Sequence, residues 1–197
     1  MLERHDEEDA EDIRRVLAGD PSAYAGLVAR HARRLHDLAR RMLRDGHEAE
    51  DIVQHAFLNA YKALPRFDLQ RPFRHWLLRI TSNLCRNRLA ARKVRRKELA
   101  ARGTDELLPT VPDRSADDPP PGWSAHVAEA IEQLPEHYRL AVVLRYQHDC
   151  TLEEISAITG IPVATVKTHL HRGRAALAKF LQPPETGQAT GGTEGGR

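Results

Sequence analysis

The 197-residue sequence has few of the features on which several common classes of protein depend. It holds two cysteines, Cys85 and Cys150, and no CxxC pair, which excludes a disulfide-rich framework. Aromatic residues make up 5% of the chain, which is poor material for a β-sandwich. No run of about 18 apolar residues is present, and the N-terminus lacks the basic and apolar stretches of a signal peptide. We therefore expect a soluble, cytoplasmic protein with no membrane insertion.

Motifs that would indicate an enzyme are also missing. The sequence has no GxxxxGK[ST], GxGxxG or HExxH pattern, and its closely spaced histidines do not share a helix face well. Glu153 and Glu154 are adjacent, so on a helix they diverge by about 100° and cannot act as an acid/base pair on one substrate. We expect no catalytic activity, no cofactor, no metal and no small-molecule substrate. Cys150, with His148 nearby, leaves a redox or zinc switch as an open alternative.

Charge is distributed unevenly along the chain. The formal net charge is +2, yet residues 1–20 hold eight acids and three bases, while residues 71–102 hold eleven Lys or Arg and one acid. A basic cluster of that density repels itself unless an anion neutralises it, and a nucleic-acid backbone is the commonest anion of that shape. The alternative is a solvated helix face without a partner, but such faces usually mix both signs.

Composition predicts an all-α protein with two small helical domains joined by a flexible linker. Two segments have the Ala-, Leu- and Arg-rich periodicity of amphipathic helices, and two others are rich in proline, glycine or both, with few large apolar residues. The predicted boundaries are 1–20 for an acidic N-terminal extension, 21–100 for the first domain, 101–124 for an acidic, Pro-rich linker, 125–181 for the second domain and 182–197 for a disordered tail.

The helix predicted over residues 48–64 has one apolar face. Its apolar residues recur at intervals of three and four: Ala49, Ile52, Val53, Ala56, Phe57, Ala60 and Leu64. Leu58 falls on the opposite, polar face. An exposed leucine there is either an isolated surface residue or an anchor for a partner.

The next predicted helix follows Pro72 and interleaves aromatic with basic residues. Its predicted inner stripe is Phe73, Trp76, Leu77, Ile80 and Leu84. Cationic groups beside flat apolar surfaces suit single-stranded nucleic acid, because they hold phosphates while unstacked bases find an apolar surface. The alternative is that the aromatic residues, including Phe67 in the preceding loop, are ordinary core residues.

The second domain contains the pattern of a helix-turn-helix. Thr151 and Glu154 form a predicted capping box, Gly160 and Ile161 make a turn, and Pro162 is suited to open the following helix. Between Pro162 and residue 181 there are four Lys or Arg and no acid. Two helices with a glycine turn and a basic second helix are typical of a unit whose second helix enters the major groove of DNA.

Two blocks of sequence resemble bacterial sigma factors of the extracytoplasmic-function (ECF, group 4) type in the sigma-70 family. The segments 49–61 and 73–83 are similar to region 2, and the segments 134–146 and 153–174 are similar to region 4, in the family's order. Two departures are that many relatives carry an acid where this chain has Asn87 and an alanine where it has Gly173.

The resemblance implies a function, partners and site residues. A sigma factor binds core RNA polymerase through the β′ clamp helices and the β flap, melts the −10 element with region 2 and reads the −35 element as duplex with region 4. An anti-sigma factor is a further implied partner. The residues matching the polymerase-binding surface are Asp51, Gln54, Phe57 and Leu58. Those expected at the −10 element are Phe67, Arg71, Phe73, Arg74, Trp76, Arg79, Asn83 and Arg86. Those expected at the −35 element are Thr165, Lys167, Thr168, His169, Arg172 and Arg174.

Two other functions compete with this one. A helix-turn-helix regulator would use residues 22–100 for dimerisation or sensing and would bind its operator without polymerase. A nuclease, the remoter alternative, would cleave DNA in the presence of a metal.

Overall fold

The computed structural model describes residues 2–101 and 124–181, with side chains from residue 5 onward. The secondary structure within these ranges is helical, which confirms the all-α prediction. The tail and nearly all of the predicted linker lie outside the described residues. None of the described helices is long and apolar enough to cross a membrane. The helices are α1 (Leu2–Leu17), α2 (Tyr24–Leu43), α3 (Gly46–Ala63), α4 (Phe73–Ala101), α5 (Ala125–Gln133), α6 (Glu136–Tyr146), α7 (Leu152–Thr159) and α8 (Val163–Leu181), with short 3-10 turns at Pro21–Ala23 and Leu64–Arg66.

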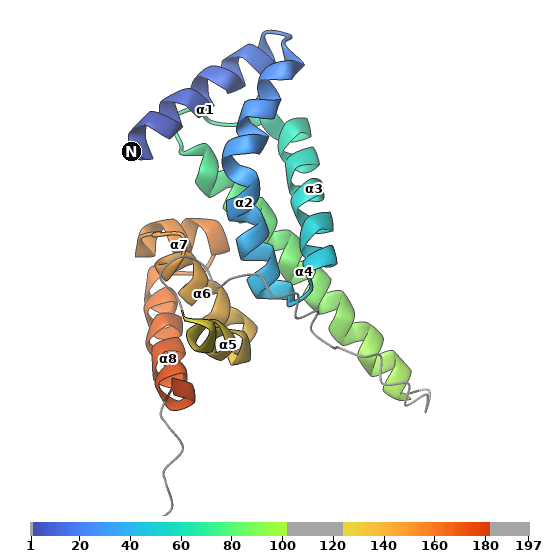
Figure 1. Ribbon diagram of the computed structural model, residues 1–197, viewed down its shortest axis with the longest axis vertical. Coiled ribbons are helices and arrows are strands. Elements are labelled where there is room, and N and C mark those ends of the chain that lie inside the picture. Colours follow the sequence, from blue (N-terminus) through green and yellow to red (C-terminus); the bar gives the residue numbers. More distant parts are fainter. Residues whose placement is uncertain (1, 102–123, 182–197) are drawn as a thin grey trace, which may run out of the picture.

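Helices α2, α3 and α4 pack against one another and form the first unit (Figure 1). The apolar face predicted for α3 is confirmed, since all of its members are buried except Val53, which is half-buried. The turn between α2 and α3 is set locally. Arg44 ends α2 in the left-handed conformation, and the Asp45 carboxylate caps α3 by accepting from the Glu48 backbone N–H at 2.9 Å.

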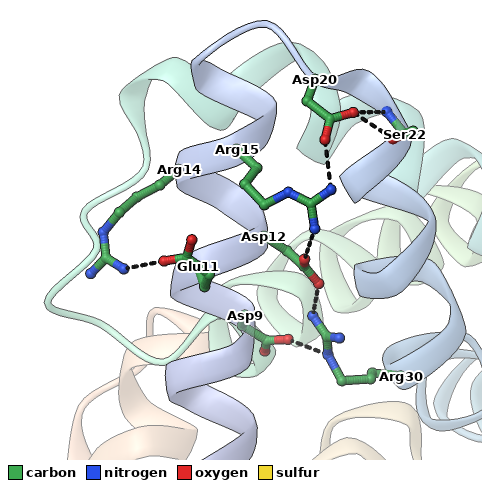
Figure 2. Close-up of polar contacts among 8 residues, drawn as sticks. All are labelled: Asp9, Glu11, Asp12, Arg14, Arg15, Asp20, Ser22 and Arg30. Carbon is green, nitrogen blue, oxygen red and sulfur yellow. Dashed lines mark hydrogen bonds and ion pairs between the residues drawn. The ribbon is translucent and has the colours of Figure 1, made fainter.

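Helix α1 packs against α2 and α4 and is part of the first unit. Ile13 is fully buried, and the Asp9 carboxylate is only 1% exposed. Asp9 accepts hydrogen bonds from Arg30 Nε at 2.8 Å, and His31 Nε2 lies 2.7 Å from its other oxygen. Figure 2 shows that Arg30 also bridges to Asp12, at 2.5 Å. The acidic segment that composition describes as an extension is therefore a docked helix.

The second unit is built from α5 to α8, and its helix-turn-helix has the predicted local features. The capping box at the start of α7 is present in both directions, with Thr151 N–H donating to Glu154 Oε2 at 2.7 Å and Glu154 N–H donating to Thr151 Oγ1 at 3.2 Å. Gly160 ends α7 with φ of +75°, a conformation that favours glycine.

The structure gives a reason for the glycine at position 173. A Cβ atom built on Gly173 would lie 2.8 Å from Val142 Cγ2, on the neighbouring helix α6. That distance is well inside van der Waals contact, so an alanine here would push the two helices apart or displace Val142. Glycine lowers the helix propensity of α8, but its missing Cβ lets α8 pack closely against α6, and this packing offsets the loss.

The two units pack directly against each other, which the sequence analysis did not anticipate. Helix α6 contacts α2, and α7 contacts α4. Arg139 of α6 is buried at this seam and donates to the carbonyls of Met42 at 2.9 Å and Arg41 at 3.3 Å, at the end of α2, and to its own unit's Leu134 at 2.9 Å. Burial lowers the pKa of Arg139 to about 10. We use the name seam for these α2–α6 and α4–α7 contacts.

Candidate nucleic-acid and partner interfaces

The outer face of α3 carries an exposed apolar side chain between polar ones. Leu58 is 55% exposed, and Asp51 and Gln54, seven and four residues earlier, are also exposed. Residues at these spacings share one side of a helix. Tyr61 extends the same side and packs its ring edge-on against Tyr24 at 5.0 Å. The face is thus a narrow stripe of mixed character with an apolar centre.

Phe57, which the sequence analysis placed with this surface, belongs to the core instead. Only 7% of the residue is exposed, and its carbonyl accepts a hydrogen bond from the Tyr24 hydroxyl at 2.7 Å. The reason is geometric, since Phe57 lies about 100° from Leu58 around the helix, on the side that faces α2. Burial raises the pKa of the Tyr24 hydroxyl, which stays protonated as the donor.

Three aromatic residues meet where the loop after α3 enters α4. The ring centroids of Phe67 and Trp76 are 4.8 Å apart, and both lie within 5.7 Å of the Phe73 centroid. Phe73 is 2% exposed, whereas Phe67 and Trp76 are half-buried. In this arrangement Phe73 is therefore a core residue, and the partly open edge of the cluster is formed by the other two.

The aromatic cluster is connected to helix α1 through one histidine. The His31 ring packs edge-on against Phe73 with centroids 5.6 Å apart, and its Nε2 is held by the buried Asp9 carboxylate. Asp9 thus fixes the orientation of a ring on which the cluster rests. Sequence periodicity could not reveal this link, because its parts come from three separate helices.

The basic residues predicted along α4 do not share one environment. Arg71 is exposed beside Asp68 at 3.3 Å, in the loop before the helix. Arg79 and Arg86 are exposed but donate to the carbonyls of Ala157 at 3.3 Å and Thr159 at 3.2 Å. These carbonyls belong to the last turn of α7, so the seam engages two of the residues expected at DNA.

Two further residues of this set lie close to the seam or within the helix packing. Arg74 is mostly buried, 3.9 Å from Glu154 Oε1 on α7. Asn83 is half-buried. Leu78, Thr81 and Ser82 are buried too, although the predicted inner stripe of α4 omits them. Because α7 packs on α4, α4 buries more of its circumference than a single apolar stripe would indicate.

Helix α8 presents a basic surface whose exposure varies along its length. Lys167, Thr168 and Arg174 are exposed, and Thr165 is half-buried. Thr168 Oγ1 donates back to the Ala164 carbonyl at 3.1 Å. Across the described part of α8 there is no acidic side chain, so an approaching phosphate backbone meets one sign of charge.

His169 and Arg172 point toward α6 more than the helical pattern predicts. The His169 ring lies 4.9 Å from His137 and 5.5 Å from Tyr138, and its Nδ1 is buried without a hydrogen-bond partner. Arg172 is exposed, yet its Nη1 donates to the Tyr138 hydroxyl at 3.3 Å. Burial, His137 and Arg172 lower the pKa of His169, so this imidazole stays neutral at physiological pH.

Among the described residues, one group of side chains has the composition and spacing of a metal site. His75, Cys150 and Glu154 each offer a ligand atom, and these atoms lie within 4.8 Å of one another. They span the seam between α4 and α7. Neither cysteine forms a disulfide, and burial raises the pKa of the Cys150 thiol to about 12.

Both units match models of known protein families. Residues 27–95 match Sigma-70 region 2, and residues 125–177 match Sigma-70, region 4. The chain is 38% identical over 177 residues to the ECF RNA polymerase sigma factor SigW of Bacillus subtilis, covering 86% of this chain and 95% of that protein. It is 33% identical over 184 residues to the RNA polymerase sigma-H factor of Pseudomonas aeruginosa, covering 90% and 95%.

Solved structures have a similar fold. CnrH, solved in complex with the cytosolic domain of CnrY, superposes with a TM-score of 0.64 at 29% identity, over 88% of this chain and 97% of that one. The sigma factor RpoE of Bartonella quintana, solved with the anti-sigma factor NepR, has a TM-score of 0.64 at 20% identity, over 80% and 96%, and shows likeness of fold alone.

Proposed function

The chain belongs to the ECF group of the sigma-70 family of RNA polymerase sigma factors, which direct transcription initiation, and from this premise we propose which of its surfaces serve each step. Residues 21–100 of the first unit act as region 2, and the second unit, residues 125–181, acts as region 4. The observation that carries the proposal is the contrast between α3, with its apolar anchor among polar residues, and α8, which is basic and free of acids.

The outer face of α3 binds core polymerase at the β′ clamp helices. Leu58 is the apolar anchor, and Asp51 and Gln54 are polar groups at its edge. Interfaces typically concentrate their free energy in a few apolar anchors surrounded by weaker polar contacts. Phe57 packs in the core on the side of α3 that faces α2 and is not part of this surface.

The entry of α4 receives the unpaired strand of the −10 element. Phe67 and Trp76 supply the partly open edge of the aromatic cluster, against which an extruded base packs. Arg71, Arg79 and Arg86 supply cations for the phosphates of the same strand. Phe73 keeps the cluster in place as a core residue.

Helix α8 enters the major groove at the −35 element. The exposed side chains of Lys167, Thr168, Arg172 and Arg174 and the imidazole of His169 are available to contact bases and phosphates. Region 4 also contacts the β flap of polymerase in this proposal.

The seam has a consequence for the order of these events. Arg79 and Arg86 each donate through Nη1 to a carbonyl at the end of α7, so region 4 in this position competes with DNA phosphates for these two side chains. The arrangement described here is therefore a closed state, and binding to polymerase and promoter selects an open one. An anti-sigma factor is a partner that would hold such a chain away from polymerase.

The chain acts in the bacterial cytoplasm, where polymerase and promoters are found, and has no catalytic activity of its own. The direct test is reconstitution of the full chain with core RNA polymerase on a library of promoter fragments. We expect transcription from a subset of promoters only when both proteins are present. Sequence-specific DNA binding by the chain alone, with no polymerase-dependent initiation, would instead favour a conventional helix-turn-helix regulator.

A pair of substitutions on α8 separates base reading from phosphate contact. Arg172→Ala should relax preference at one or two positions of the −35 element, because a side chain that reads a base discriminates by about 1–3 kcal/mol. Lys179→Ala should weaken all sequences alike and reduce the salt slope by about one unit. Transcription from −35 variants at several salt concentrations measures both. If Arg172→Ala lowers every promoter by the same factor, Arg172 contacts the backbone and the base readers lie nearer Thr165 and Thr168.

A further inference from the structure

Three side chains from the two units converge where α7 packs on α4. His75 lies in the first turn of α4, Cys150 in the loop before α7, and Glu154 in the first turn of α7. His75 Nε2 is 3.5 Å from Glu154 Oε1, and the ligand atoms of all three residues lie within 4.8 Å of one another. Cys150 is fully buried, and the other two are partly buried.

Each of the three residues has a ligand atom that protein contacts leave available. His75 Nε2 is buried and has no hydrogen-bond partner, which is costly for a ring nitrogen. Glu154 uses Oε2 to accept from the Thr151 N–H in the capping box, and Oε1 faces His75. The Cys150 thiol makes only a long contact, 3.7 Å, to the His148 carbonyl. The capping bond also fixes the direction of the Glu154 carboxylate.

The donor set selects the class of cation. Imidazole nitrogen, thiolate sulfur and carboxylate oxygen together suit Zn²⁺, whereas Mg²⁺ and Ca²⁺ take oxygen ligands. Tetrahedral Zn²⁺ with bonds of about 2.0–2.3 Å places its ligand atoms roughly 3.4–3.6 Å apart. His75 Nε2 and Glu154 Oε1 already have that spacing, and all three atoms lie within 4.8 Å of one another. Side-chain movements of about 1 Å would complete the site, with water as the fourth ligand.

The charges around the site are compatible with a dication. A thiolate and a carboxylate neutralise the two charges of Zn²⁺. Arg74, whose side chain is 12% exposed, lies 3.9 Å from the same Glu154 oxygen, so the metal would replace one long ion pair.

We propose that His75, Cys150 and Glu154 bind one Zn²⁺ ion that joins region 4 to region 2 across the seam. The Cys150 thiol loses its proton to solvent as the zinc–sulfur bond forms. The ion links α4 to α7 and so favours the closed state, in which Arg79 and Arg86 donate hydrogen bonds to carbonyls of α7. Zinc would thereby make Arg79 and Arg86 less available to promoter DNA.

The experiment is a titration of the full, reduced, metal-free chain with Co²⁺ and then Zn²⁺, without polymerase. We expect one equivalent of Co²⁺ to give a thiolate-to-cobalt charge-transfer band, and one equivalent of Zn²⁺ to displace it. Cys150→Ala should remove the band, and Glu154→Gln should weaken binding at least about 10-fold. Glutamine can still complete a capping box, so Glu154→Gln keeps the fold of α7.

Cys85→Ala is the matched control, because Cys85 is the other buried cysteine and lies outside the site. It should leave the charge-transfer band and the affinity unchanged. A second readout is amide hydrogen exchange. In the unaltered chain, Zn²⁺ should slow exchange in α7 and in residues 75–86. In the Cys150→Ala variant, Zn²⁺ should leave exchange in these segments unchanged. A Co²⁺ complex without the thiolate band, or equal zinc affinity in the chain and in folded Glu154→Gln, would overturn the proposal. Both readouts are independent of sigma-factor activity.

Discussion

Replacing Leu58 by aspartate should abolish binding of the chain to core RNA polymerase and leave its helical content unchanged. Leu58 is more than half exposed in the free chain, so a carboxylate there meets water and costs little folding stability. In the complex the same position would be the centre of an interface, where an unpaired charge loses its hydration. A hot-spot loss of at least about 2 kcal/mol corresponds to roughly a 30-fold weaker affinity.

The measurement is the dissociation constant of the chain for core polymerase, with circular dichroism as the test of folding. Val94→Asp is the matched control, because Val94 is a β-branched apolar residue with 56% exposure that belongs to α4 and not to α3. It should bind core polymerase as the unaltered chain does. A folded Leu58→Asp variant with unchanged affinity would show that the outer face of α3 is not the docking surface.

Replacing Asp9 by alanine should destabilise the first unit by about 3–5 kcal/mol, because it leaves buried cationic or polar partners without their acceptor. Asp9 accepts from Arg30 and lies within bonding distance of His31, whose side chain is 6% exposed. The Arg30 side chain is 22% exposed and keeps Asp12 as a second partner. The release of His31 should also loosen Phe73 and the aromatic cluster that rests on it. Urea unfolding with native-state hydrogen exchange over α1 and α4 measures both effects.

Glu11→Ala supplies the comparison for Asp9→Ala on the same helix. Glu11 pairs with Arg14 at 3.2 Å on the exposed side of α1, as Figure 2 shows. An exposed pair of this kind contributes about 0–1 kcal/mol, so the substitution should be nearly neutral. Equal stability losses for the two substitutions would mean that the burial of Asp9 does not stabilise the docking of α1.

Local patterns predicted much of the fold. The apolar face of α3, the capping box at Thr151 and the left-handed turn at Gly160 each depend on residues close in sequence. Their geometry follows from helical periodicity and from side-chain hydrogen bonding to nearby backbone, which needs no knowledge of the tertiary structure. The location of Leu58 on the polar face of α3 was predictable for the same reason.

The docking of α1 and the seam were not predictable in this way. Asp9 lies among many acids, and nothing local distinguishes it from its exposed neighbours, since its partners are more than 20 residues away. Arg139 looks like an ordinary helix-surface cation, yet it is buried because the end of α2 offers unpaired carbonyls.

The acceptors at the seam have an evolutionary consequence. Arg79, Arg86 and Arg139 all donate to main-chain carbonyls, at Ala157, Thr159 and Met42 respectively. Every amino acid carries that carbonyl, so the residues opposite these arginines can drift without losing the bond. Conversely, no substitution at the facing position can compensate for the loss of an arginine, because the acceptor there is a main-chain carbonyl. Pairwise covariation between α4 and α7 would therefore be weak at Arg79 and Arg86 although the helices touch, and genetic suppressors of Arg79 or Arg86 substitutions should map to other sites.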